Sequence, residues 1–109
     1  MPTAKINDDS LDVSLLLTTL VAFRKGDFSA RMPLDWTGTA GKVADTLNSI
    51  IETSDRMAQE LSRISRAVGK EGQLGQRLVL GDVTGAWAGK ADSINTLLED
   101  LARPAAETA

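Results

Sequence analysis

Apolar residues recur at alternating spacings of four and three along the proline-free stretch from Thr39 to Gly69. The series runs through Val43, Leu47, Ile50, Met57, Leu61, Ile64 and Val68, with Ser54 as its single polar position. A heptad spacing of this kind places the apolar side chains on one face of a helix and is typical of a coiled coil. The stretch therefore predicts one continuous helix over about residues 39–69.

The residues before this stretch predict a shorter helix over about residues 9–25. Its expected core positions again follow the heptad spacing, and they are Leu11, Leu15, Thr18 and Ala22. The candidate N-caps are Asn7, Asp8, Asp9 and Ser10. Asp12 is expected in the first turn, and Gly26 follows the helix as a natural left-handed stop. Further leucines widen the apolar face, which implies packing against more than one neighbouring helix.

Between the two helices the period changes from that of a helix to alternation. The apolar positions of this connector are Phe28, Met32, Leu34 and Trp36. Alternation usually indicates a strand, but Pro33 and the lack of a partner strand favour an extended strap along a helical bundle. About 12 extended residues span ~35–40 Å, more than the ~24 Å length of a helix of ~16 residues. The second helix can therefore start beside the start of the first and run parallel to it.

The chain also repeats itself. Residues 26–32 align with 72–78 at an offset of 46, and after one inserted residue 44–52 align with 91–99. We expect two helix–connector–helix units, 9–54 and 55–103, which share the long helix, with 104–109 as a tail or the start of a further unit. The expected core of the last helix, over about 86–103, comprises Trp87, Ala91, Ile94, Leu97, Leu98 and Leu101.

Composition narrows the possible chemistry. The 109 residues contain no cysteine and no histidine, which removes disulfides, thiol chemistry and the commonest general base and metal ligand. We therefore expect no catalytic residues, cofactor or metal. The net charge of −3 argues against nucleic acid as a partner, and the lack of a long apolar run argues against a membrane span. The expected location is the cytoplasm.

Two sets of residues invite a functional reading that the sequence does not favour. The first set, Gly69, Gly72, Gly75, Gly81 and Gly85, lacks the spacing of a phosphate-binding loop and is expected to form turns. The second set, Glu52, Arg56, Glu60 and Arg63, lies at helical neighbour spacing and predicts a solvated face with weak ion pairs. Trp36 and Trp87 are expected to anchor the core, with ligand stacking as the alternative.

The helix, glycine, connector and asparagine-bearing second helix together resemble the HAMP domain of sensor kinases and chemoreceptors. Two copies of the pattern cover nearly the whole chain and are most similar to the tandem HAMP arrays of soluble hybrid histidine kinases. The residues that carry the resemblance are Gly26 and Gly72, Phe28 and Leu74, Leu34 and Leu80 or Met32 and Leu78, and Asn48 and Asn95. The resemblance implies an all-α, parallel homodimer with two consecutive four-helix bundles that transmit conformational signals.

The expected function is signal relay within a two-component histidine kinase. The chain itself is expected to be non-catalytic, with a second copy as its partner and further signalling domains beyond Ala109. Ser54 marks the junction of the two units, either as a soft point or as a tolerated polar residue. Asn48 and Asn95 are expected to bind the connectors, with solvent exposure as the alternative. Two other functions stay open: a passive dimerisation spacer and a helical module that binds a peptide or ligand in a groove.

Overall fold

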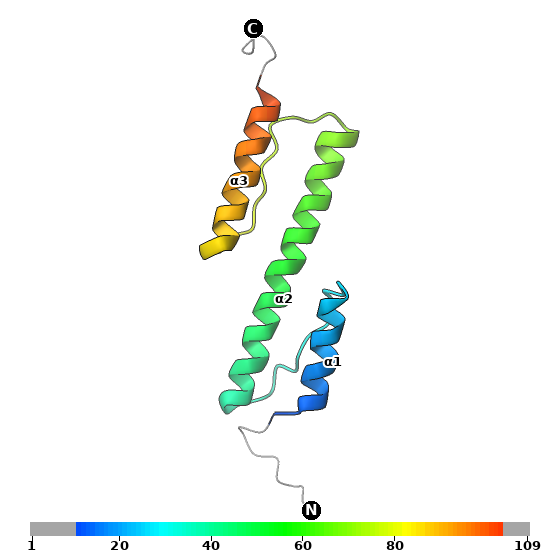
Figure 1. Cartoon of the computed structure of the whole chain (residues 1–109), viewed down its shortest axis with the longest axis vertical. Helices are drawn as coiled ribbons and strands as arrows, with labels where there is room; N and C mark the ends of the chain where they lie inside the picture. The colour runs from blue at the N-terminus through cyan, green and yellow to red at the C-terminus, as the bar shows by residue number, and fades with distance from the viewer. Residues whose placement is uncertain (1–10, 104–109) are drawn as a thin grey trace, which may run out of the picture. The chain divides into compact units, whose positions relative to one another are not determined.

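The computed structural model describes residues 11–103, which form helices joined by extended connectors (Figure 1). Helix α1 comprises Val13–Arg24, α2 comprises Gly38–Ile64, a π-helical segment follows over Ser65–Lys70, and α3 comprises Gly85–Ala102. Residues 11–103 contain no β-strand, so the fold class is all-α and the alternating connector is a strap. Within residues 11–103, no helix combines the length and apolarity that a membrane crossing requires.

The chain divides into two compact units, unit 1 (Met1–Asp55) and unit 2 (Arg56–Ala109). The division falls inside α2, so this helix contributes its first part to unit 1 and its last part to unit 2. Within each unit the connector returns along its first helix, and the second helix then runs in the same direction as the first (Figure 1). The parallel order that the connector length predicts is therefore present in both units.

Local hydrogen bonds set both ends of α1. The Asp12 side chain accepts a hydrogen bond of 3.0 Å from the Leu15 amide, so Asp12 is the N-cap rather than a residue of the first turn. The start expected at residue 9 is wrong by four residues, and the other cap candidates lie outside the described residues. At the other end, Gly26 has a φ of +90° and the Asp27 amide bonds the Ala22 carbonyl, as in a Schellman motif.

The end of α2 departs from the single α-helix that the heptad spacing predicts. Regular α-helix stops at Ile64, and Ser65–Lys70 winds as a π-helix. The Glu71 amide bonds the Arg66 carbonyl at 3.0 Å, five residues back rather than four. Helical backbone therefore reaches Lys70, but its last turn is wider than the turns before it.

Each unit has its own apolar core beneath its connector. In unit 1 the buried residues are Met32, Ala44, Leu47 and Ile51, and Leu16, Phe23, Phe28 and Trp36 pack against them. In unit 2 the buried residues are Ile64, Leu78, Leu80 and Leu98, and Met57, Val68, Val83, Ala91 and Ile94 pack against them. Full burial of one such aliphatic side chain is worth about 1.5–3 kcal/mol, so both connectors contribute directly to the stability of their unit.

Candidate functional site

An asparagine of the second helix binds the connector in each unit. In unit 1 the Asn48 side chain accepts from the Met32 amide at 2.7 Å and donates to the Met32 carbonyl at 3.1 Å. In unit 2 Asn95 makes the same two bonds with Leu78, at 2.6 and 3.1 Å. Met32 and Leu78 are buried residues, and the bonds to Asn95 are buried whereas those to Asn48 are partly buried, so both sets satisfy backbone groups that folding removes largely from water. Both asparagines thus lie at the connector-binding positions expected from the sequence.

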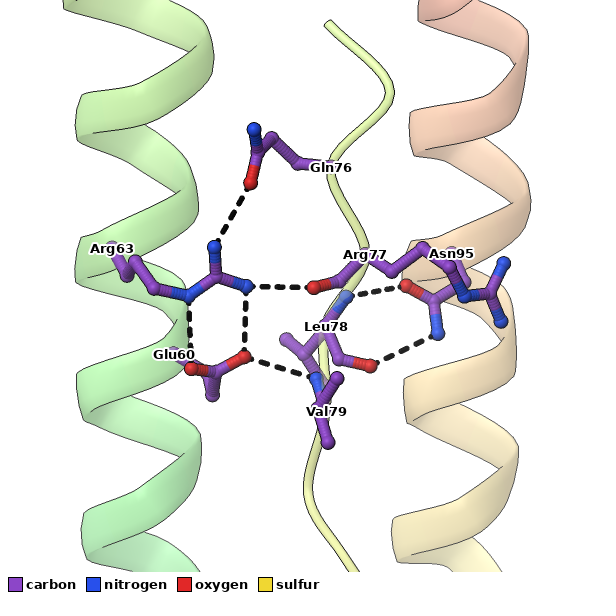
Figure 2. Close-up of polar contacts among 7 residues, drawn as sticks. All are labelled: Glu60, Arg63, Gln76, Arg77, Leu78, Val79 and Asn95. Carbon is purple, nitrogen blue, oxygen red and sulfur yellow. Dashed lines mark hydrogen bonds and ion pairs between the residues drawn. The ribbon is translucent and has the colours of Figure 1, made fainter. Parts of the chain in front are cut away.

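The connector of unit 2 is also held from the opposite side, by α2 (Figure 2). The Glu60 carboxylate accepts from the Val79 amide at 3.0 Å. Arg63 donates to the Gln76 side chain at 2.9 Å and to the Arg77 carbonyl at 2.7 Å. Glu60 and Arg63 are joined to each other by two hydrogen bonds of 3.0 Å. Successive connector residues are therefore bound in turn by α2 and by α3.

The hydrogen bonds of this network favour the ionised forms of both charged groups. Hydrogen bonds from Arg63 and then from the Val79 amide lower the pKa of Glu60 below its ordinary value of 4.5. The hydrogen bond to Glu60 raises the pKa of Arg63. A pair held in a bidentate arrangement and bonded to backbone is stronger than an isolated surface ion pair. The network is thus a stable element at neutral pH.

Arg56 extends the same face of α2 towards the end of the connector. Its Nη1 donates to the Leu80 carbonyl, and its buried Nε has no partner among the described residues. Gly81 follows with a φ of +84°, and a Cβ at this position would lie 2.6 Å from Arg56 Nη1. Glycine at position 81 therefore suits the left-handed backbone, and a Cβ there would make the guanidinium end of Arg56 shift.

A connector arginine also pairs with a glutamate of the second helix in each unit. Arg31 and Glu52 approach to 3.4 Å in unit 1, and Arg77 and Glu99 approach to 3.3 Å in unit 2. These four residues occupy equivalent positions of the repeat. All are substantially exposed, so each pair contributes well under about 1 kcal/mol.

The network corrects the interpretation of Arg56, Glu60 and Arg63 as part of a solvated face, whereas Glu52 is exposed with a weak ion pair, as that interpretation expects. All four contact a connector residue, and Arg56, Glu60 and Arg63 bond connector backbone. The helical spacing of opposite charges occurs on solvated faces as well, so the spacing alone did not distinguish the two cases. A signal that could have identified Glu60 and Arg63 is their difference from the first repeat, where α1 has Ser14 and Leu17 at the equivalent positions.

The other expected connector anchors take different positions in the two units. Gly26 and Gly72 both have positive φ, of +90° and +66°. Phe28 is half-buried and contacts the Phe23 ring, with 5.3 Å between ring centroids, whereas its counterpart Leu74 is exposed. Leu80 is buried, whereas Leu34 is 83% exposed and is not part of the core of unit 1. The inserted residue of the second connector lies between Leu80 and Val83, where the first connector runs from Leu34 to Trp36.

The expected bundle-core residues fall into three groups by exposure. Leu47, Ile64 and Leu98 are buried within the single chain. The half-buried members are Leu11, Leu15, Ala22, Val43, Met57, Val68, Ala91 and Ile94. The exposed members are Thr18, Ile50, Leu61, Trp87, Leu97 and Leu101. Ser54, the junction residue, is half-buried.

In unit 1, the residues of α2 that are most buried are not all those of the heptad series. Two of them each follow a heptad residue by one position. Ala44 and Ile51 are fully buried and face the connector core with Leu47. Val43 and Ile50, which belong to the heptad series, lie on the adjacent side, with Ile50 46% exposed. Gly41 is buried against the Trp36 carbonyl, where a Cβ would clash. The helix therefore uses one apolar face for its connector and leaves a second one open.

The open face borders an apolar groove in unit 1. The groove has a volume of about 390 Å³ and is lined mainly by Leu16, Leu20, Val43, Leu47 and Ile50 from α1 and α2. Trp36 lies in the core on the other side, half-buried, and Trp87 of unit 2 is 39% exposed. Among residues 11–103 no three or more acidic side chains gather as a metal site would require.

No protein-family model matches the chain, and no solved structure matches it. The resemblance to HAMP domains therefore stays a prediction that depends on the residues that carry it. The site defined by the structure is a pair of polar clamps that hold the two connectors.

Proposed function

We propose that the chain is a signal-relay module that works as a parallel homodimer, in which each unit forms a four-helix bundle with its copy. The observation that carries the proposal is the second apolar face. Within one chain, α1 exposes Val13, Leu17 and Leu20 at helical spacing, and these side chains are 67%, 59% and 41% exposed. An exposed apolar face of this kind is unfavourable for a monomer in water. A second copy of the chain could cover it.

The same pattern recurs on the other two helices. Ile50 and Leu61 of α2 are 46% and 43% exposed, and Leu97 and Leu101 of α3 are 59% and 55% exposed. All four belong to the heptad series expected to form the bundle core. A second copy in parallel register would cover each face with the identical face of its partner, which is the arrangement of a parallel coiled coil.

Relay requires that a change in one unit alters the other. Helix α2 is common to both units, so a rotation or shift of this helix is a change in both. In each unit the asparagine bonds the second helix to the connector beside it. A movement of the helix can therefore be transmitted to the connector. The resemblance to HAMP domains supports the same function and places the chain in a histidine kinase, where the output domain would follow Ala109.

Single cysteines test the dimer, because the chain contains none of its own. Cysteine at Ile50 in unit 1 and, separately, at Leu97 in unit 2 should cross-link two chains with a short bis-maleimide. Asp45→Cys, on the exposed polar side of α2, is the matched control and should not cross-link. Light scattering across concentration should give twice the chain mass. A monomeric mass, or cross-linking at neither apolar position, excludes the parallel dimer.

A passive spacer would give the same dimer, so relay needs its own measurement. Asn48→Ala loosens the connector of unit 1, and the readout is hydrogen exchange at the Leu78 and Val79 amides of unit 2. Relay predicts altered exchange in unit 2, whereas a spacer predicts none. Glu52→Ala, which removes only an exposed ion pair in unit 1, serves as the control.

The groove in unit 1 supports a second candidate function, a module that binds an apolar helix or peptide. This function predicts a monomer in solution whose groove stays open. The mass measurement separates the two candidates, because the proposed dimer covers Leu20 and Ile50 of the groove lining.

A further inference from the structure

The two connectors differ in how they are attached to the helix that precedes them. We propose that Glu60 and Arg63 form a tie, specific to unit 2, that makes the second connector move together with α2, while the first connector is free to slide along α1. This inference rests on the proposed relay and adds a difference between the units. The connector of unit 1 can shift relative to its first helix, whereas the connector of unit 2 cannot.

The repeat provides the comparison. At the offset of 46 residues, Ser14 and Leu17 stand in α1 where α2 has Glu60 and Arg63. On the connector, Ala30 and Pro33 stand where unit 2 has Gln76 and Val79. Four of the five residues of the tie are thus replaced in unit 1, and the fifth, Arg77, contributes only its carbonyl and aligns with Arg31.

Each replacement removes a bond for a stated chemical reason. Proline has no amide hydrogen, so nothing at position 33 can donate as Val79 does to Glu60. Leucine at 17 and alanine at 30 have no polar side-chain atoms, so the contact between Arg63 and Gln76 has no equivalent. The tie therefore cannot form in unit 1, whatever the side-chain conformations.

The contacts of the first connector agree with this difference. Its bonds through Met32 and Arg31 lead to Asn48 and Glu52, which both belong to α2, the second helix of that unit. Towards α1 it presents the Phe28 ring, which contacts Phe23. Apolar ring contacts are not directional in the way hydrogen bonds are, so they permit sliding at little cost.

The second connector, in contrast, is bonded on both sides at adjacent residues. Val79 is held by Glu60 of α2, and Leu78 is held by Asn95 of α3 (Figure 2). A shift of α2 along its axis therefore displaces Leu78 and its bonded partner on α3. In this way the backbone between Arg77 and Val79 acts as a cross-bar between two parallel helices.

Hydrogen exchange of the full chain tests the tie residue by residue. Glu60→Ala should speed exchange of the Val79 amide about tenfold or more, because its acceptor is lost. The informative amide is that of Leu78, which Glu60 does not touch. If the connector is a cross-bar, Leu78 exchange also rises by about threefold or more, and it rises more than exchange of the Met32 amide in unit 1.

Two further variants control the result. Val79→Pro removes the donor and reproduces the chemistry of unit 1 at this position, so it should speed exchange at Leu78 as Glu60→Ala does. Glu52→Ala removes a connector contact of the second helix in unit 1, and it should leave Leu78 unchanged. A response confined to Val79, or an equal rise at Met32 and Leu78, overturns the proposal.

Light scattering on the same samples keeps this test separate from that of the proposed function. If the Leu78 amide responds and the chain is a monomer, the tie stands and the dimeric relay fails. If the chain is a dimer and the Leu78 amide does not respond, the tie fails and the relay retains its own test.

Discussion

Asn95 binds both backbone polar groups of Leu78, accepting from its amide at 2.6 Å and donating to its carbonyl at 3.1 Å. Asn48 does the same for Met32, although the two partners are 16 residues apart in unit 1 and 17 in unit 2. The same pair of hydrogen bonds is therefore present in both units, although the second connector is one residue longer than the first. The additional residue is accommodated between Leu78 and α3, where the chain turns at Gly81.

We expect the two asparagines to differ in their effect on stability. Asn95→Ala leaves the buried amide and carbonyl of Leu78 without partners and should lower the free energy of unfolding by about 2–4 kcal/mol. Asn48→Ala should cost about 1–2 kcal/mol, because Asn48 is half-buried and water can replace part of its role. Urea unfolding at one fixed protein concentration gives both values. An Asn95→Ala cost below that of Asn48→Ala would contradict the argument.

Acidification should remove the contribution of the Glu60 network. The pKa of Glu60 is lowered in the folded chain, so its stabilisation is complete above the ordinary value of 4.5 and is lost as the pH falls through the lower, folded value. Within residues 11–103, the charged partner bonded to its carboxylate is Arg63 of the same helix, which stays protonated throughout. The wild type should therefore melt above Glu60→Gln at pH 7, and the difference should shrink as the pH falls below 4.5. A difference independent of pH would show that charge plays no part.

Gly81 should tolerate alanine less well than Gly72 does. Both have positive φ, so alanine costs about 1–2 kcal/mol of backbone strain at either position. At Gly81 the new Cβ would also make the guanidinium end of Arg56 shift and weaken its hydrogen bond to the Leu80 carbonyl, which adds about 0.5–1 kcal/mol. Around Gly72 there is no atom within 4 Å of such a Cβ. In an Arg56→Ala background the additional cost of Gly81→Ala should disappear, and equal costs with Arg56 present would refute the contact.

Ser54→Leu should raise the melting temperature. Ser54 is the half-buried polar position in the heptad series of α2, and leucine would extend the apolar seam there. A gain of about 1 kcal/mol corresponds to a rise of roughly 4 °C, measured by circular dichroism. A lower melting temperature would mean that Ser54 makes a contact the chain needs, and the soft-junction hypothesis would fail.

The sequence by itself determined the helices and the strap between them. The 3.6-residue period marks each helix, and alternation with Pro33 marks a segment that is extended but cannot join a sheet. The repeat also placed Asn48 and Asn95 in equivalent positions, because a polar residue beside a core position in both copies indicates a shared partner. These features are local or periodic, so they can be recognised without knowing which segments meet.

Only the tertiary structure decided which face of α2 meets the connector and which charges bind it. Ala44 and Ile51 rather than Val43 and Ile50 became the buried face, because the connector passes on that side. Glu60 and Arg63 became a clamp rather than a solvated pair, because the backbone of Val79 and Arg77 lies within hydrogen-bond distance. A hydrogen bond depends on a distance between segments far apart in sequence, and helical spacing contains no information about that distance.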